Sequence, residues 1–389
     1  MIDSSSQAAV AGAPAPSAFP PLPDRVRALV IGAGPAGLAT SRELARRGVE
    51  HVVLERGARV ASCWAELYDS LRLHTGKHMS ALPGLPFGRD VPLFPTREHF
   101  VAYLQRYAET NRVPLHQRCV VARLERTDDG WRAHTSRGPV DARAVVVATG
   151  IISNPRVPSI PGREIFRGRV MHSVTYRRPI AFAGRRVLVV GVGNSGGEIA
   201  SELARAGIDV TVAVRSGANV VPLTLAGVPI QYLSYWLRKL PRAAQQKVAD
   251  AVRLLGEKRR GPPVLPRPAH SPLDAIPMIG FHLVDEIRAG RVKVAPSVAA
   301  FGSTTVRFTD GTERHFDDVI LATGFSAALG ILRGSIRLDE RGFASRSDRV
   351  TSADHPGLFF VGQNYDSSGG LFNIARDAPL AAEKVAALR

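Results

Sequence analysis

Cysteine is scarce in this chain of 389 residues, which contains only Cys63 and Cys119. The two residues lie far apart in the sequence and form no Cys-x-x-Cys pair. A redox-active dithiol of that type passes electrons through two neighbouring thiols. The sequence therefore excludes a reductase that works through a Cys-x-x-Cys disulfide.

Long apolar runs are also absent. Hydrophobic residues make up 45% of the chain, but no run approaches the ~20 residues that a membrane-spanning helix needs. Residues 1–23 are rich in Ala, Pro and Ser and have neither a basic beginning nor a continuous apolar core. We therefore expect a disordered leader and no secretory signal. The composition predicts a soluble, cytoplasmic protein with room for two ordinary domains.

Lysine is rare as well, so arginine carries most of the formal net charge of +17. A charge of this size suits a nucleic-acid partner, because neutralised phosphates supply most non-specific affinity. The arginines are scattered, however, and no RNA-binding or helix-turn-helix signature accompanies them. We expect no nucleic-acid partner and interpret most of the charge as a solvated surface.

One basic stretch stands apart from this scatter. Trp236 to Arg260 predicts a helix, because its apolar residues recur at roughly helical spacing. Such a helix could rest on a membrane surface, form a lid over a substrate, or pack on the protein with a solvated basic face. The pattern favours the packed helix. Pro262 to Pro272 then predicts a loop, since proline breaks helices.

A glycine-rich turn follows the first apolar run, residues 26–31, and precedes a segment of helical spacing, residues 38–48. The turn consists of Gly32, Ala33, Gly34, Pro35, Ala36 and Gly37. In a strand-turn-helix unit the glycines let the backbone approach a pyrophosphate, and the helix N-terminus offers free N–H groups to it. The next apolar run ends at Glu55, where a carboxylate can hydrogen-bond a ribose diol. These features predict a dinucleotide site.

A second turn of the same pattern lies between strand-forming residues 186–190 and a helical segment, residues 198–207. It consists of Gly191, Val192, Gly193, Asn194, Ser195 and Gly196. The following strand ends at Arg215 and Ser216, in the place that Glu55 holds in the first unit. A guanidinium can pair with a 2′-phosphate that a carboxylate would repel. The first site is therefore predicted to hold FAD and the second NADPH.

The second turn also fits another class of protein. Residues 193–197 match the Gly-x-Ser-x-Gly nucleophile elbow of α/β-hydrolases, which would make Ser195 a nucleophile. That motif explains neither Arg215 nor the first turn. A hydrolase remains the distant alternative.

The order of segments predicts an α/β fold with two Rossmann-like dinucleotide-binding domains, one inserted into the other. We expect the FAD-binding domain to comprise residues 24–158 and 322–389. The NADPH-binding domain is expected over residues 159–321, with a basic helical insertion at about 220–275.

Phe166, Gly168, His172 and Tyr176 match the pattern Phe-x-Gly-x-x-x-His-x-x-x-aromatic. In this respect the chain resembles the class B flavin monooxygenases, whose Baeyer–Villiger members usually have tryptophan at the place of Tyr176. Three further segments resemble the plant YUCCA indole-3-pyruvate monooxygenases and their bacterial relatives: residues 64–77, 82–87 and 94–97. The resemblance extends over nearly everything from about residue 26 onward.

The resemblance implies a set of cofactor contacts. The first turn with Glu55 and Arg56 would hold FAD, and the second turn with Arg215 and Ser216 would bind NADPH. His172 is expected between the domains, in a structural more than a catalytic role. The remaining candidates for cofactor contact are Trp64, Leu73, His74, Thr75, Lys77, Thr323, Gly324 and Gly362.

Two details qualify this assignment. Many relatives have Gly-Asp after the last strand, whereas this chain has Gly362 and Gln363. The acid expected near the ribityl or pyrophosphate group is therefore missing. His74 and His78 are four residues apart, but no third ligand accompanies them, so we expect no metal site.

By resemblance, NADPH would reduce FAD, NADP⁺ would stay bound, and O₂ would add to the reduced flavin as a C4a-(hydro)peroxide. The protein would supply position and a dry cavity. The YUCCA-like segments favour oxidative decarboxylation of indole-3-pyruvate to indole-3-acetate, the auxin-forming reaction. Oxygenation of a soft nitrogen or sulfur is the alternative. The expected partners are O₂ and a small-molecule substrate, and the protein is expected to be a monomer or homodimer.

Overall fold

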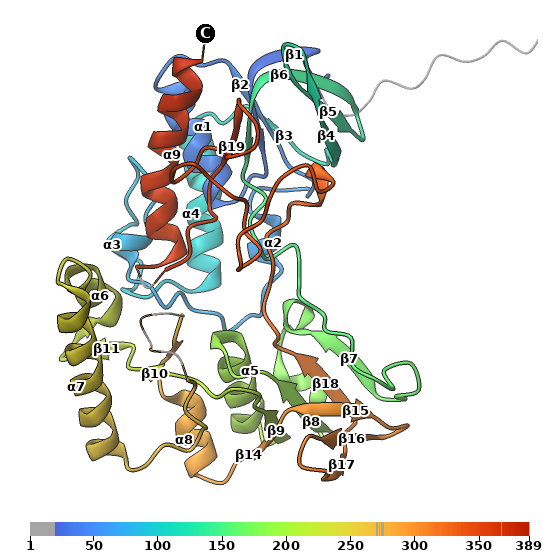
Figure 1. Ribbon diagram of the computed structural model, residues 1–389, viewed down its shortest axis with the longest axis vertical. Coiled ribbons are helices and arrows are strands. Elements are labelled where there is room, and N and C mark those ends of the chain that lie inside the picture. The colour runs from blue at the N-terminus through green and yellow to red at the C-terminus, as the bar shows by residue number, and fades with distance from the viewer. Residues whose placement is uncertain (1–19, 270, 272, 274–275, 367, 389) are drawn as a thin grey trace, which may run out of the picture.

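The computed structural model describes residues 20–269, 271, 273, 276–366 and 368–388. Figure 1 shows two bodies, each built on its own sheet, with helices α6 and α7 standing along one side. The predicted disordered leader falls almost entirely on residues 1–19, which lie outside the described residues.

The first body is built on a seven-stranded sheet of order β3-β2-β1-β6-β5-β4, with β19 beside the end of β6. Its central strands are rich in valine and almost fully buried, as expected for strands covered on both faces. Strands β1, β2, β3, β6 and β19 pair in parallel, and β4–β6 form an antiparallel meander. The strands are β1 (Arg25–Ile31), β2 (His51–Leu54), β3 (Leu115–His116), β4 (Val121–Thr127), β5 (Gly130–Thr135), β6 (Gly138–Val147) and β19 (Leu358–Phe360).

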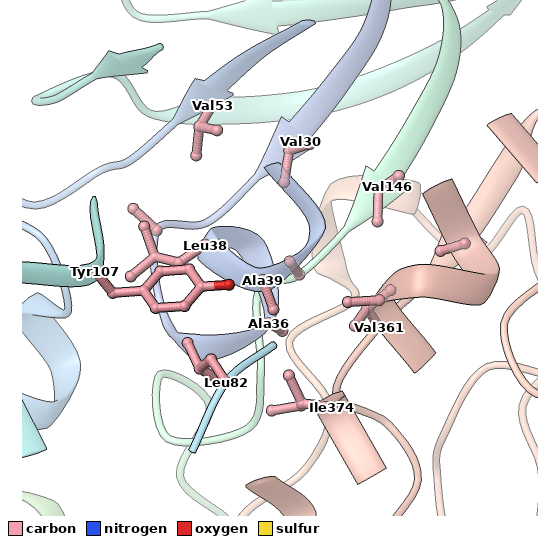
Figure 2. Packing of buried hydrophobic residues seen from close by; sticks show 14 of the residues in the cluster. Val30, Ala36, Leu38, Ala39, Val53, Leu82, Tyr107, Val146, Val361 and Ile374 are labelled. Carbon is pink, nitrogen blue, oxygen red and sulfur yellow. The ribbon is translucent and has the colours of Figure 1, made fainter. Parts of the chain in front are cut away.

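Helix α1 lies at the centre of this body. Figure 2 shows Leu38 and Ala39 of α1 facing the sheet, α4 and α9. The small side chains of Ala36 and Ala39 let neighbouring elements approach closely. The surrounding residues are Val30, Val53, Val146, Tyr107, Val361 and Ile374. The helices of this body are α1 (Pro35–Ala45), α2 (Ser62–Ala65), α3 (Lys77–Ser80), α4 (Arg97–Thr110) and α9 (Gly370–Ala387).

The second body contains a five-stranded parallel sheet of order β14-β9-β8-β18-β7. Helices α5 (Asn194–Arg205) and α8 (His282–Arg288) cover one face, and the antiparallel strands β15–β17 cover the other. Short 3-10 helices of this body lie at Ser173–Thr175 and Pro179–Phe182, whereas a third, Gly330–Leu332, packs on the first sheet. The strands are β7 (Arg169–His172), β8 (Arg186–Val190), β9 (Asp209–Ala213), β14 (Val292–Ala295), β15 (Val298–Phe301), β16 (Thr305–Phe308), β17 (Glu313–His315) and β18 (Asp318–Leu321).

The predicted α/β fold with two dinucleotide-binding units is confirmed. The chain leaves the first sheet after β6, builds the second sheet, and returns to pair β19 with β6. Both predicted strand-turn-helix units are present, as β1–α1 and β8–α5. The domain boundaries themselves stay a prediction.

The predicted single helix over residues 236–260 is wrong. The structure has two helices, α6 (Ile230–Leu237) and α7 (Arg242–Arg260), with Pro241 directly before α7. Proline lacks an N–H and disfavours helical backbone in the residue before it, so the first helix ends and a new one begins. The packed helix is also wrong, because none of the residues of α7 is buried.

The segment between β9 and α8, which contains these two helices, also contains short strands. They are β10 (Val220–Val221), β11 (Thr224–Leu225), β12 (Val228–Pro229) and β13 (Met278–Ile279). The described residues of the predicted loop at 262–272 lie in neither helix nor strand, as expected. Among the described residues, no helix combines the length and the apolar character required to cross a membrane.

Replacement of Leu38 by alanine tests the central position of α1. Leu38 is fully buried, so Leu38→Ala should lower the free energy of unfolding by about 2–5 kcal/mol. The matched control is Leu338→Ala, because Leu338 is 55% exposed and its loss should cost at most about 0.5 kcal/mol. Urea unfolding of both variants measures the difference, and equal midpoints would contradict the packing described for α1.

Candidate dinucleotide and substrate site

A large cavity of about 2020 Å³ runs between the two bodies. Ligand pockets usually measure about 300–1,000 Å³, so this cavity has room for more than one bound molecule. Both glycine-rich turns contribute to its wall, and so do α6 and α7.

The three glycines of the first turn differ in the space around them. Gly32 has φ +106°, and a Cβ there would lie 2.6 Å from the Ala148 carbonyl oxygen. A Cβ on Gly37 would lie only 1.7 Å from the Gly32 carbonyl oxygen. By contrast, a Cβ on Gly34 would meet nothing within 4 Å, and Gly34 lines the cavity. The outer glycines are required by packing, and the middle one leaves the space that a pyrophosphate would fill.

The second turn repeats this arrangement. Gly191 has φ +103°, and its Cβ would lie 2.6 Å from the Ala322 carbonyl oxygen. A Cβ on Gly196 would lie 2.1 Å from the Gly191 carbonyl oxygen, whereas Gly193 faces open space. The backbone of both turns therefore fits a dinucleotide.

Glu55 lies buried at the end of β2 and is held by the turns around it. Its carboxylate accepts hydrogen bonds from the backbone N–H groups of Ala33 and Gly57, each at 2.8 Å. Each carboxylate oxygen has a second lone pair for a ribose hydroxyl. Glu55 also lines the cavity, next to exposed Arg56.

Arg215 lies exposed just beyond the end of β9. Its guanidinium makes no hydrogen bond or ion pair with any residue that the structure describes. The side chain is therefore available to a phosphate of a bound nucleotide.

The first body presents an aromatic and polar wall to the cavity. Trp64 packs edge-on against Phe100, with ring centroids 4.7 Å apart, and Leu73, His74 and Thr75 continue the wall. Thr75 Oγ1 is 2.6 Å from Ser80 Oγ, which fixes the hydroxyl of Thr75.

The expectation that Lys77 contacts a cofactor is corrected. Lys77 does not line the cavity, and its ammonium donates to the carbonyl oxygens of Gly88 at 3.1 Å, Arg89 at 3.4 Å and Val91 at 2.6 Å. An ammonium has three N–H donors, so none is left for a ligand. Lys77 instead holds the following loop in place.

His172 connects the signature segment to the end of the second sheet. Its Nδ1 accepts from the Val174 N–H at 3.1 Å, so the proton lies on Nε2, which donates to the Gly324 carbonyl oxygen at 3.1 Å. Burial lowers the pKa of His172, which keeps the ring neutral. Since both ring nitrogens are bonded to backbone, the contacts support a structural role.

Gln363 also has a structural contact. Its side-chain Oε1 accepts from the Ala344 N–H at 3.0 Å, and the residue is buried. An acid does line the cavity three residues later, where Asp366 pairs with Arg238 at 2.6 Å. No motif in the sequence identifies this pair.

Helix α6 docks on the first body, a contact that sequence reasoning missed. Gln231 is buried; its Oε1 accepts from the Gly76 N–H at 3.1 Å, and its Nε2 donates to the Ser368 carbonyl oxygen at 2.5 Å. Tyr232 Oη lies 2.9 Å from His78 Nδ1. Because α6 belongs to the segment between β9 and α8 of the second body, its contacts with the first body join the two bodies beside the cavity.

Helix α7 turns one face to the cavity. The cavity-lining residues Val248, Val252, Leu255 and Arg259 recur at helical spacing. Val248 and Leu255 remain 42% and 43% exposed. The apolar face is therefore a cavity wall, which matches the lid alternative for this stretch and not the packed helix.

The structure brings most of the predicted residues together. Those that line the cavity are Gly32, Gly34, Pro35, Ala36, Glu55, Arg56, Trp64, Leu73, His74, Thr75, Asn194, Ser195 and Gly362. Those that do not are Ala33, Gly37, Lys77, Gly191, Val192, Gly193, Gly196, Arg215, Ser216, Thr323 and Gly324.

Neither a metal site nor a nucleophile elbow fits the described residues. Within the described parts of the chain, no group of three or more His, Cys, Asp or Glu residues could hold a metal ion. Ser195 lies in the first turn of α5 and is not among the residues with positive φ, whereas the elbow needs a strained turn. Cys63 and Cys119 are free, and burial is the main cause that raises the pKa of Cys63 and keeps it a thiol.

Comparison with known proteins points in one direction. Residues 29–226 match the family model of the pyridine nucleotide-disulphide oxidoreductases. The chain is 38% identical over 309 residues to rice indole-3-pyruvate monooxygenase YUCCA1, which covers 77% of this chain and 76% of that protein. It is 34% identical over 384 residues to rice YUCCA4, covering 90% and 85%. A flavin-containing monooxygenase from Stenotrophomonas maltophilia superimposes with TM-score 0.74 at 26% identity, over 93% of this chain and 98% of that chain.

Two glycine variants separate cofactor contact from folding. Gly34→Ala should fold normally, because its φ of −82° suits alanine, but should purify with less FAD, since the methyl group enters the open space of the turn. Gly37→Ala should lower the unfolding temperature, because its methyl group would collide with the Gly32 carbonyl. Flavin absorbance and thermal unfolding measure the two effects. A Gly34→Ala protein with full FAD content would refute the role assigned to this turn.

Proposed function

Because the chain belongs to the flavin-dependent monooxygenases, which use FAD and NADPH, we propose that it oxidatively decarboxylates indole-3-pyruvate or a similar aromatic 2-oxo acid. The reaction consumes one NADPH, one proton and one O₂, and yields the shortened carboxylic acid, CO₂, NADP⁺ and water. One oxygen atom of O₂ enters the new carboxylate and the other leaves as water.

The observation that carries this proposal is the similarity to rice YUCCA1, which extends over 77% of this chain at 38% identity. That protein is named an indole-3-pyruvate monooxygenase. The identity is well above that to the bacterial flavin-containing monooxygenase, which is 26%. We therefore take the substrate class from the plant relatives.

The proposed cofactor seats follow the two turns. The first turn and Glu55 hold FAD, and the second turn and Arg215 hold NADPH. When bound, reduced flavin supplies the activation of O₂. This division assigns residues 24–158 and 322–389 to the FAD-binding domain and residues 159–321 to the NADPH-binding domain.

The cavity wall formed by α6 and α7 suits an aromatic anion. Apolar side chains of both helices line it, and an aromatic ring would pack against them. Arg259 lines the same region and makes no ion pair or hydrogen bond with the described residues, so its charge is available to a carboxylate. The apolar wall residues are Leu233, Leu237, Val248, Val252 and Leu255.

NADPH should be preferred to NADH, because Arg215 can pair with the 2′-phosphate. Arg215→Ala should lose about 1.5–3 kcal/mol of that preference, the range for hydrogen bonds to charged groups. Arg307→Ala serves as the control, since Arg307 is also exposed but lies on β16, away from the turn. The ratio of kcat/KM for NADPH and NADH measures the effect. An unchanged ratio in Arg215→Ala would show that another group selects the cofactor.

Indole-3-pyruvate should accelerate NADPH oxidation and yield one indole-3-acetate for each NADPH consumed. Incubation under ¹⁸O₂ should place one labelled atom in the product carboxylate. Catalase must be present, because hydrogen peroxide from an uncoupled reaction would decarboxylate a 2-oxo acid without the enzyme.

Product formed only in the absence of catalase would overturn the proposal. If amines or thioethers stimulate NADPH oxidation and aromatic 2-oxo acids do not, the alternative of N- or S-oxygenation replaces it.

A further inference from the structure

The Glu198 carboxylate on α5 of the second body contacts the first body. Glu198 lies on the second helical turn after the glycine-rich turn, and it contacts two residues of the first body's segment 67–75. Its Oε2 accepts from the Tyr68 hydroxyl, and its Oε1 contacts His74 Nε2. The side chains of His74 and Glu198 are both only 19% exposed. Glu198 itself does not line the cavity, but Tyr68 and His74 do.

Tyr68 is anchored in the second body although it belongs to the first. It is buried in the hydrophobic cluster beneath α5, with its ring centroid 6.2 Å from that of Tyr176. Burial, reinforced by the neighbouring Glu198 carboxylate, raises the pKa of Tyr68 well above its usual value. The hydroxyl therefore stays protonated and can donate to Glu198.

The backbone reinforces the same contact. The Asp69 N–H donates to the Arg177 carbonyl oxygen at 3.0 Å, directly beside the Tyr68 ring. The Asp69 carboxylate also pairs with Arg178 at 3.5 Å, so segment 67–75 is attached to the second body at Tyr68, Asp69 and His74. The same segment ends in the cavity wall formed by Leu73, His74 and Thr75.

We propose that Glu198 is a positioning residue, which fixes the start of α5 against the flavin-side wall of the cavity. Asn194 and Ser195 line the cavity at the start of α5, and Glu198 follows them within about one helical turn. A ligand bound at the second turn would therefore be held at a fixed distance from a ligand bound beside Trp64. The inference rests on the proposed cofactor seats.

The geometric demand on such a site is strict. Transfer between two bound groups needs reacting atoms roughly 3–3.5 Å apart, and a misplacement of about 1 Å can cost a factor of ~100 in rate. Loss of Glu198 leaves Tyr68 and His74 without their partner and loosens the two bodies at this contact, while Gln231 on α6 still joins them. Transfer should suffer more than binding, because the proposed phosphate contacts, at the start of α5 and at Arg215, all lie within the second body.

The test compares Glu198→Ala and Glu198→Gln with Glu202→Ala. Glu202 lies one turn further along α5 and accepts from Tyr176 at 2.9 Å, a hydrogen bond that lies within the second body. Glu202→Ala therefore removes a comparable tyrosine–carboxylate hydrogen bond from the same helix and serves as the matched control. Tyr68→Phe is a milder variant, which keeps the ring packing and removes only the hydroxyl donor.

Stopped-flow reduction of the bound flavin by NADPH, without any organic substrate, gives the first readout. Glu198→Ala should reduce the rate by roughly 10- to 100-fold, with the NADPH dissociation constant changed less than about 3-fold. Glu198→Gln should recover part of the rate, because its amide oxygen still accepts from Tyr68. Glu202→Ala should resemble the wild-type protein.

Hydrogen–deuterium exchange without NADPH gives a second readout that does not depend on turnover. Exchange over residues 67–75 should rise in Glu198→Ala and Tyr68→Phe, and stay unchanged in Glu202→Ala. Equal exchange in all variants, or equal slowing by Glu198→Ala and Glu202→Ala, would overturn the inference. If NADPH fails to reduce the wild-type flavin, the proposed function fails, and the exchange comparison alone decides whether Glu198 joins the bodies.

Discussion

The close approach of a helix to the strand before it, repeated in both bodies, is the constraint on which the cavity depends. A Cβ on Gly37 would lie 1.7 Å from the Gly32 carbonyl oxygen, and a Cβ on Gly196 2.1 Å from that of Gly191. No side chain fits at either contact. Because each helix starts so tightly against its strand, its N-terminal N–H groups lie at the strand's carboxyl end, where open α/β sheets bind ligands.

The insertion of one unit into the other then decides how the two turns face each other. The second sheet is built between β6 and β19, so its position depends on contacts that cross between the bodies. The crossing contacts have different chemistry: the Glu198 carboxylate on α5, which contacts Tyr68 and His74, and the buried amide of Gln231 on α6, which bonds Gly76 and Ser368. Both lie beside the cavity, whose wall is formed by residues of both bodies.

The sequence predicted what depends on local signals. Glycine spacing and valine-rich runs located both strand-turn-helix units, and Glu55 and Arg215 lie where these units predicted them. The sequence did not predict contacts in which a side chain bonds a backbone group that only the tertiary fold brings near. Lys77 turns back to three carbonyls of the loop that follows it, and Gln363 bonds the backbone of Ala344. No sequence pattern predicts either contact, because each one depends on which backbone group the tertiary fold brings close to the side chain.

Helix α7 shows why the substrate end was harder to predict than the cofactor end. A helix is normally stabilised by burying its apolar face, yet α7 buries no residue and turns Val248 and Leu255 toward the cavity. It is tied to its surroundings through ion pairs near its end, Glu257 with Arg267 at 2.7 Å and Arg260 with Asp285 at 2.8 Å. A ligand bound in this part of the cavity would pack against the apolar face that α7 leaves uncovered. Substitutions on this face can therefore change what the cavity admits while both glycine-rich turns keep their sequence, since α7 begins 46 residues after the second turn ends.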